Sequence, residues 1–371
     1  MIDPITFGLV AFAPPGTSGV TQNLHEMKIG VNYKIGADPS ASWAVGAPVY
    51  PVKAEAPPPP VWLPGWEGEA GGRYFGGWGQ FHKDIGQLVG SGIPSISSVS
   101  RLTYDGMQTN AGEFFGRVDS PWNLFLKGFV GGGQIRNGHM NDEDFGIPFV
   151  IPGPLLIDLP YSSTLASPVT GNTTYGAVDG GFDVKRGPGY KIGLFAGYFW
   201  FDEKMNAFGC TVVSGFNCIP PVPATGSANI TENDRWQAVR LGVAGETMLF
   251  DRLKLSGEVA YLPWVKLNGV DQHFFGNSGI LASDNPESGN GRGVQLEAFL
   301  SYYITPHFSV GVGGRYWGLW TSNNGQVTRD FDATGGPTGG LQYFKGVVEQ
   351  AGVLVQASYK FGSPGAVVAR Y

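Results

Sequence analysis

Apolar and polar residues alternate with a period of two along much of this chain. The clearest case is the segment 253–275, whose first half carries two interleaved sets of residues. One set is apolar and the other mostly polar: Leu253, Leu255, Val259, Tyr261 and Val265 against Lys254, Ser256, Glu258, Trp264 and Lys266. Because successive side chains of a strand point to opposite sides, this alternation predicts a β-strand with one apolar and one polar face.

Ten segments of this kind follow one another. We expect strands at residues 72–83, 99–118, 124–144, 175–185, 190–205, 236–249, 253–275, 293–304, 308–320 and 343–361. Short turns, such as the one at residues 120–123, alternate with long loops along this series. That asymmetry is typical of outer-membrane barrels, in which the periplasmic turns are short and the outer loops are long.

Composition points the same way. The chain of 371 residues has 59 Gly, 24 Phe, 15 Tyr and 10 Trp but only 15% charged residues, which favours β architecture with aromatic girdles over a helical enzyme. It has no run of 18 apolar residues, so we expect no transmembrane helix. The formal charge of -6 argues against nucleic acid as a partner, which would need a basic surface.

The polar face of the predicted strands carries many charges, namely Lys127, Arg240, Glu246, Lys254, Glu258, Glu297, Arg315 and Lys360. A lipocalin-like barrel or a β-sandwich would bury its apolar face inside, and charges in a sandwich core would be prohibitive. In the lumen of a membrane barrel they are acceptable. We therefore predict an all-β fold, a ten-stranded antiparallel transmembrane β-barrel of outer-membrane type.

The ends of the chain differ from this barrel. Residues 1–36 contain one alternating segment that is similar to residues 352–361, so we interpret 1–36 as an orphan strand, a possible remnant of an upstream barrel. Residues 37–70, which include four consecutive prolines, are interpreted as an extended linker. We expect the barrel at 71–361 and a short tail at 362–371. The first residues lack the basic and apolar regions of a signal peptide.

The chain has two cysteines, Cys210 and Cys218, in one segment rich in proline and glycine. No second pair of Cys or His lies nearby to complete four metal ligands, so a local disulfide is favoured over a metal site. A disulfide would imply an oxidising compartment.

Two predicted strands end in acidic motifs. The strand 124–144 ends in Asp142-Glu143-Asp144, and the strand 253–275 carries Asp271 and His273 near its end. Both strands run outward, so both motifs should lie at the same rim. Because alternate residues share a face, Asp142 and Asp144 would point together, as would Asp271 and His273. A carboxylate two residues from an imidazole is a plausible acid-base pair.

These motifs resemble those of the omptins, outer-membrane endoproteases of Gram-negative bacteria, over roughly residues 71–361. The resemblance rests on Met-x-Asp-x-Asp-aromatic at residues 140–145 and on Asp-x-His-aromatic at residues 271–274, with weaker matches at 100–104, 193–198 and 302–306.

The resemblance implies catalytic roles without a metal or a covalent intermediate. His273 would be the general base and Asp271 would orient it, while Asp142 and Asp144 position the attacking water. It also implies outer-membrane lipid and polypeptides as partners, lipopolysaccharide as a possible activator, an extracellular active site, no cofactor and a monomeric barrel.

The family further prefers basic residues beside the scissile bond and binds them with acids. Asp84 could supply one such acid, but Gly269 stands where a second would be expected. By simple parity, Asp271 and His273 fall on the lipid-facing side of their strand. We expect a β-bulge near Asn268-Gly269 to turn both inward.

Other interpretations stay open. The acidic segment 142–144 could be a solvated loop cluster, His273 an ordinary rim histidine, and His139 with Asp142 a weak metal site. For the whole molecule, a small porin or an adhesive or structural barrel that retains the motif competes with the protease. A narrow lumen filled by aromatic side chains would argue against the porin.

Overall fold

The computed structural model describes residues 61–89, 99–145, 149–150, 156–157, 161–215, 218, 228–275, 280–322, 325–328, 341–362 and 366–368. Every regular element among them is a β-strand. The described residues contain no helix long and apolar enough to cross a membrane.

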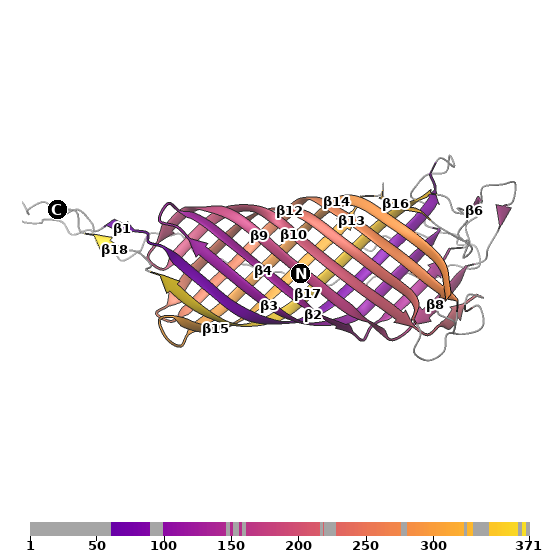
Figure 1. The fold of residues 1–371 in the computed structure, drawn as a ribbon, viewed down its shortest axis with the longest axis horizontal. Coiled ribbons are helices and arrows are strands. Elements are labelled where there is room, and N and C mark those ends of the chain that lie inside the picture. The colour runs from indigo at the N-terminus through magenta and orange to yellow at the C-terminus, as the bar shows by residue number, and fades with distance from the viewer. Residues whose placement is uncertain are drawn as a thin grey trace, which may run out of the picture. The chain divides into compact units, whose positions relative to one another are not determined.

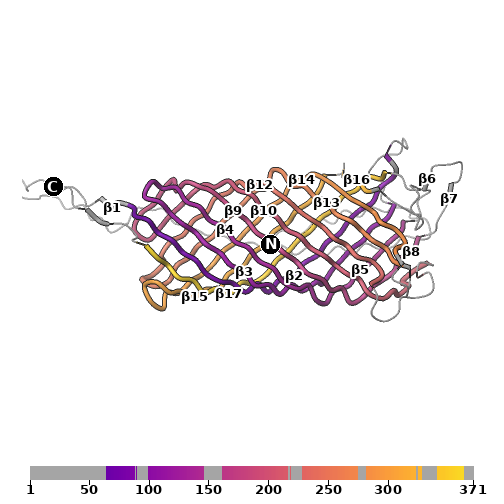
Figure 2. The backbone as a smooth tube through the Cα atoms, viewed as in Figure 1, coloured from indigo at the N-terminus to yellow at the C-terminus, as the bar shows by residue number. Residues whose placement is uncertain are grey.

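Long antiparallel strands pair with one another in a closed ring (Figures 1 and 2). In order around the ring they are β2 (Glu67–Leu88), β3 (Ser100–Asp119), β4 (Leu124–Arg136), β9 (Val169–Gly187), β10 (Tyr190–Phe208), β12 (Ala228–Phe250), β13 (Leu253–Phe275), β14 (Ile280–Tyr303), β15 (Phe308–Thr321) and β17 (Leu341–Gly362). The pairing of β17 with β2 closes the ring. The predicted all-β antiparallel barrel is confirmed.

Shorter strands extend the ring. β5 (His139–Asp144) pairs with residues 100–105 of β3, β8 (Ser162–Ala166) pairs with β5, and β11 (Thr211–Ser214) pairs with β8. β16 (Gly325–Thr328) pairs with β14 and β17, while β6 (Phe149–Val150) and β7 (Leu156–Ile157) form a separate pair. In Figure 1, β8, β6 and β16 gather at one end of the barrel, which we call the loop end.

The opposite end, the turn end, carries the short connections. Residues 120–123, 188–189, 251–252 and 304–307 join neighbouring strands there, and Asn123 and Gly189 adopt the positive φ values that tight turns require. β1 (Val61–Leu63) pairs with β18 (Ala366–Val368) at this end (Figure 1).

These pairings revise the predicted domain limits. The expected linker 37–70 ends in β1 and in the first residues of β2, and the expected tail 362–371 contains β18. Residues 1–36, interpreted as an orphan strand, lie outside the described residues.

The outer surface divides into two zones along the strands. Towards the turn end, the outward positions are apolar and exposed, and we call this zone the apolar belt: it includes Tyr74, Trp78, Phe114, Val130, Leu194, Tyr198, Val239, Val259, Trp264, Val353 and Val355. Towards the loop end, most exposed outward positions are polar, among them Gln80, Gln108, Arg136, Lys204, Arg235, Asn268 and Asn290. The strands therefore continue well beyond the belt.

Side chains occupy much of the lumen. At the level of the belt, buried cations pair with carboxylates of other strands, for example Arg240 with Asp179 at 2.6 Å and Arg315 with Glu113 at 2.5 Å. Above them Trp317, which is 1% exposed, lies against a group of aromatic rings: Phe75, Tyr175, Phe199 and Phe201. This packing separates the lumen at the turn end from the chemistry at the loop end.

Candidate active site

Asp271 and His273 of β13 form a hydrogen-bonded pair at the loop end. His273 Nε2 lies 2.9 Å from Asp271 Oδ2. The carboxylate is buried, whereas the imidazole side chain is 24% exposed. A buried carboxylate that orients a partly exposed imidazole is the arrangement in which the ring can exchange a proton with a bound molecule.

A bulge in β13 turns this pair inward, but not where the sequence suggested. The register of β13 shifts between Leu262 and Val265, where β13 has one residue more than either neighbouring strand. Pro263 lies inside this shift, and proline cannot donate to the ladder. Before the shift the buried residues are even-numbered, as at Leu262, and after it they are odd-numbered, as at Val265 and Asp271. The predicted bulge near Asn268-Gly269 is therefore wrong in position.

The predicted strand 124–144 is also broken, and the break orients the Asp pair. β4 ends before Asn137 and Gly138, whose φ values are 59° and 97°, and β5 begins after them. Asn and Gly are the residues that adopt such angles most readily. In β5 Met140 is fully buried, and Asp142 shares its face because alternate residues of a strand point the same way.

Strand pairing indicates that Asp142 points into the lumen, opposite the hydrogen-bonded pair Asp271–His273, which we call the dyad. Lys83 of β2 pairs with Leu102 of β3, which pairs with Asp142 of β5. Residues directly opposite each other share a face, so these three side chains point inward together. From this row the Lys83 ammonium reaches within 3.2 Å of Asp271 Oδ2. Asp144 lies two residues further along β5 and accepts a hydrogen bond from Ser162 Oγ at 3.3 Å.

A buried phenol reports on both acidic motifs. Tyr104 of β3 is fully buried beside Met140, its partner in β5. Burial raises the pKa of the Tyr104 phenol well above its usual value, and the negative charges of Glu232, Asp271, Asp234 and Asp142 add to this increase. The phenol is therefore affected by acids of both motifs.

Sequence reasoning missed a charged cluster below the dyad, which we call the Lys83 cluster: Lys83, Glu232, Asp234, Asp271 and Glu287. The Lys83 ammonium lies 2.5 Å from Glu232 Oε2 and 3.1 Å from Glu287 Oε2. All these side chains are at most 1% exposed apart from Glu287, at 3%. The three acids Glu232, Asp234 and Glu287 have oxygens within 4.8 Å of one another.

The charged side chains of this cluster strongly affect one another's pKa. Burial alone would lower the pKa of the Lys83 ammonium, but attraction to Asp271 and Glu232 outweighs it and raises that pKa well above the ordinary value. Burial and the neighbouring carboxylate of Glu287 raise the pKa of Glu232 and of Asp234. The only sequence signal for Lys83 was its position between Phe81 and Ile85 on the inward face.

Two other predicted residues lie elsewhere. Asp84 is on the opposite face of β2 from Lys83, and its Oδ1 accepts a hydrogen bond from Arg101 Nε at 2.6 Å. The structure thus does not bring Asp84 to the dyad, because successive strand residues point apart. His139 is exposed on the opposite face of β5 from Asp142, so these two side chains do not converge.

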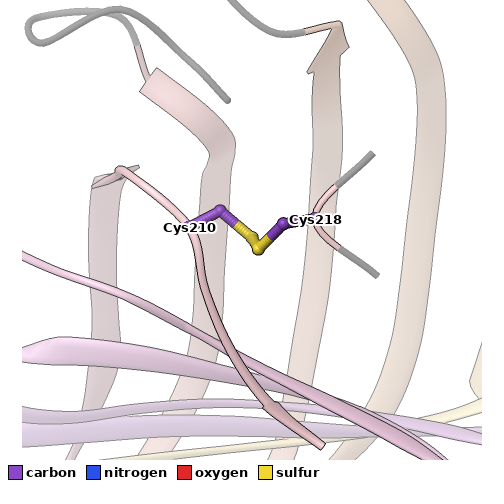
Figure 3. The surroundings of a disulfide bond; sticks show 2 residues. All are labelled: Cys210 and Cys218. Atoms are coloured by element: carbon purple, nitrogen blue, oxygen red, sulfur yellow. A yellow bond between two sulfur atoms is a disulfide. The ribbon is translucent and has the colours of Figure 1, made fainter. Parts of the chain in front are cut away.

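The two cysteines are joined, as predicted. Cys210 and Cys218 form a disulfide in the connection between β10 and β12 at the loop end (Figure 3). Cys210 directly precedes β11, so the bond ties the chain just beyond β10.

Comparisons with known proteins bear on this barrel. Residues 169–343 match the model described as the Omptin family. The outer membrane protease OmpT from Escherichia coli has a similar structure, with a TM-score of 0.56 and 16% identity, covering 81% of this chain and 98% of that chain. The family match covers residues 169–343, and a structural match at this identity shows the barrel fold. The chain is therefore similar to the omptins. The family match includes Asp271 and His273 but begins after Asp142 and Asp144, which rest on the motif and on strand pairing.

Two other structures are less similar to this barrel. A Pseudomonas aeruginosa FadL homologue gives a TM-score of 0.23 at 9% identity, covering 80% of this chain and 90% of that one. The Ralstonia pickettii toluene transporter TbuX gives 0.20 at 9% identity, with 80% and 89% covered. TM-scores this low do not support a shared fold or function. No curated protein sequence matches the chain.

One departure from the family pattern has a structural cause. The resemblance implies an acid at position 269, where this chain has glycine. A Cβ atom at Gly269 would come within 2.0 Å of Asp234 Oδ1 and 3.1 Å of Glu287 Oε1. Carboxylates from β12 and β14 therefore occupy the space that an acidic side chain on β13 would need.

Proposed function

We propose that this protein is an omptin-like outer-membrane endopeptidase that hydrolyses peptide bonds with a water molecule activated by Asp271 and His273. The observation that carries the proposal is the 2.9 Å contact between His273 Nε2 and Asp271 Oδ2, with the imidazole partly exposed and the carboxylate buried. The similarity to OmpT, an outer membrane protease, supports the same reaction class.

The proposed reaction uses each residue at a stated atom. Nε2 of His273 is engaged by Asp271, so Nδ1 is the ring atom that takes a proton from water. The resulting hydroxide attacks the peptide carbonyl carbon, and the imidazolium then returns its proton to the departing amine nitrogen. Asp271 stabilises the imidazolium, while Asp142 and Asp144 hold the water from β5 across the lumen.

The surface supports a membrane setting for this reaction. We propose that the apolar belt lies in the lipid of a Gram-negative outer membrane and that the loop end, with the site, faces the exterior. Lipopolysaccharide is then a plausible activator, polypeptides are the substrates, and the barrel acts as a monomer. The hydrolysis needs neither a metal nor a cofactor in this scheme.

The passive pore has less support. Trp317 and the aromatic rings around it fill the lumen, and the buried pairs Arg240–Asp179 and Arg315–Glu113 cross it at the level of the belt. An open channel would require these side chains to move aside.

The test is cleavage of a peptide library by the refolded barrel in lipopolysaccharide-containing micelles, with cut sites read by mass spectrometry. The variants His273→Ala, Asp271→Asn and Asp142→Asn should each slow cleavage by about 100-fold or more, the usual size of general acid-base catalysis. His139→Ala is the matched control, since His139 is exposed on the other face of β5, and should cleave like the parent. Equal rates in the parent and the three site variants would reject the peptidase.

A further inference from the structure

The strand that carries Asp142 and Asp144 lies outside the closed ring. β5, β8 and β11 extend β3 as one sheet at the loop end, in the order β3–β5–β8–β11. Asp142 of β5 pairs with Thr164 of β8, and Thr164 pairs with Val212 of β11. One side of β5 is therefore held by the barrel wall, whereas the other side depends on β8 and, beyond it, on β11.

β8 contacts the Asp pair directly. Ser162 Oγ donates a hydrogen bond to Asp144 Oδ2 at 3.3 Å. Ser162 and Thr164 are both buried, so neither side chain can move without displacing its neighbours. Because Ser162 contacts one carboxylate and Thr164 is the backbone partner of the other aspartate, a displacement of β8 would change the position of both acids.

β11 lacks the apolar burial that would keep an edge strand in place. All four of its residues, Thr211–Ser214, are exposed, and its register with β8 shifts between Val212 and Ser214. Among the described strands, β11 pairs with β8 alone. A short edge strand without a buried face is marginally stable by itself, so another restraint is needed.

The disulfide supplies this restraint. Cys210 directly precedes β11 and Cys218 follows it, so the bond closes a covalent loop around the strand (Figure 3). We call residues 210–218 the disulfide loop. Closing a loop reduces the number of conformations that its residues can adopt. Within it, Gly215 lies against β8, since a Cβ atom at Gly215 would come within 2.7 Å of Ser162 Cβ. The loop thus packs against the residue that donates to Asp144.

We propose that the disulfide loop is a positioning element of the active site: the Cys210–Cys218 bond keeps β11 on β8, and β8 keeps Asp142 and Asp144 where they bind the attacking water. This inference rests on the proposed peptidase function. Dithiothreitol reduces the bond by supplying two electrons and two protons, which yields two cysteine thiols and the cyclic disulfide of the reagent. The reduced loop is no longer covalently closed, and the Asp pair loses part of its support.

The first test measures kcat and KM separately for a fluorescent peptide without cysteine, before and after the folded barrel is treated with dithiothreitol. Reduction should lower kcat by about 10-fold, because a small displacement of groups that position a reactant slows the chemical step. KM should change by less than about 2-fold, since the contacts that bind the peptide are retained. Removal of the reagent and reoxidation should restore kcat.

Cys210→Ser/Cys218→Ser is the control for the reagent. It should have the low kcat of the reduced parent, and dithiothreitol should not change it further. Because the parent is reduced after folding, the first test does not depend on whether this variant refolds. An unchanged kcat in the reduced parent would overturn the proposal. So would a higher KM at constant kcat, because the loop would then bind the peptide and not position the Asp pair.

Two glycine variants test the contact with Ser162 while the disulfide stays intact. Gly215 and Gly209 have φ values of 78° and 72°, so alanine imposes similar backbone strain at both positions. Only at Gly215 would the new Cβ meet Ser162, whereas at Gly209 it would lie 3.6 Å from Ser167 O. Gly215→Ala should lower kcat by about 10-fold relative to its matched control, Gly209→Ala. Equal kcat values in the two variants would contradict the role of this contact.

A measurement without substrate separates this inference from the proposed function. Hydrogen exchange followed by mass spectrometry reports the opening of individual strands. Backbone amides of β5 and β8 should exchange about 10-fold faster in the reduced barrel, while those of β15 in the barrel wall should not change. If the parent cuts no peptide but β5 and β8 respond in this way, the proposed function fails and the restraint by the disulfide is supported. Unchanged exchange in β5 and β8 would overturn the inference itself.

Discussion

Glu203 shows how strongly a single lumen residue can link this barrel to pH. It lies on β10 opposite Asp234 of β12, beyond the apolar belt, and is 1% exposed. Burial raises the pKa of its carboxyl to about 8 from the ordinary 4.5. The folded barrel therefore holds this proton more tightly than the unfolded chain does. The resulting stabilisation is full below pH 4.5 and is lost as the pH rises through 8.

Replacement of Glu203 by glutamine should remove this pH dependence. We expect Glu203→Gln to match the parent at about pH 4 and to be more stable at about pH 9, by about 5 kcal/mol because each pKa unit corresponds to about 1.4 kcal/mol. Heat-modified mobility in gel electrophoresis, measured after incubation across this pH range, gives the comparison. Asp202→Asn, on the outer face of the same strand, should show no such trend. If Glu203→Gln changed the stability by the same amount at both pH values, the result would contradict a raised pKa of Glu203.

At the scale of the element, the alternating pattern predicts strands best where one face meets the apolar belt. The expected strand 308–320 agrees closely with β15 (Phe308–Thr321). In contrast, the expected start at residue 236 misses the first paired residues of β12 (Ala228–Phe250), where Glu232 and Asp234 point inward and Arg235 is exposed. Where both faces of a strand carry polar residues, the sequence has no alternation of apolar and polar positions that would predict the strand.

The candidate site, too, could be predicted from the sequence only in part. The motifs identified Asp271 with His273, whose contact the structure contains, because short spacing on one strand fixes a shared face. Lys83 and Glu287 could not be predicted as neighbours, since their contact depends on the register of strands far apart in sequence. Asp84 directly follows the expected strand 72–83, but β2 continues to Leu88, so Asp84 lies within the strand on the face opposite Lys83.

The bulge at Pro263 should therefore control the site from a distance. Deletion of Pro263 removes the extra residue of β13 and would turn Asp271 and His273 to the outer face. We expect the deleted variant to form a barrel, seen by its heat-modified mobility, but to lose peptide cleavage by about 100-fold or more. Insertion of one glycine after Gly269 in the deleted variant should restore inward parity and part of the activity. Full activity after the deletion alone would show that this bulge does not orient the dyad.

On the scale of the whole molecule, the outer surface of the barrel has two zones that suit different surroundings. Val259 and Tyr261 of β13 are 58% and 44% exposed within the apolar belt, whereas Asn268 of the same strand is exposed among polar neighbours. The Pro263 bulge lies between these zones. Below it the outer face is built for hydrocarbon and the lumen for packing. Above it the outer face is polar, and the strands support the dyad, the Asp pair and the buried Lys83 cluster.

If the belt meets lipid, a charge should be costly there and tolerated above it. Val259→Arg should lower the free energy of unfolding from lipid vesicles by about 2 to 4 kcal/mol, while Asn268→Arg should change it by about 1 kcal/mol or less. Denaturant titration followed by tryptophan fluorescence measures both, and repeating it in a detergent micelle, where the apolar layer adapts, should narrow the gap. Since both substitutions lie on the outer face of one strand, an equal cost in vesicles would mean that the hydrocarbon does not end between residues 259 and 268, and that the proposed height of the site above the membrane is wrong.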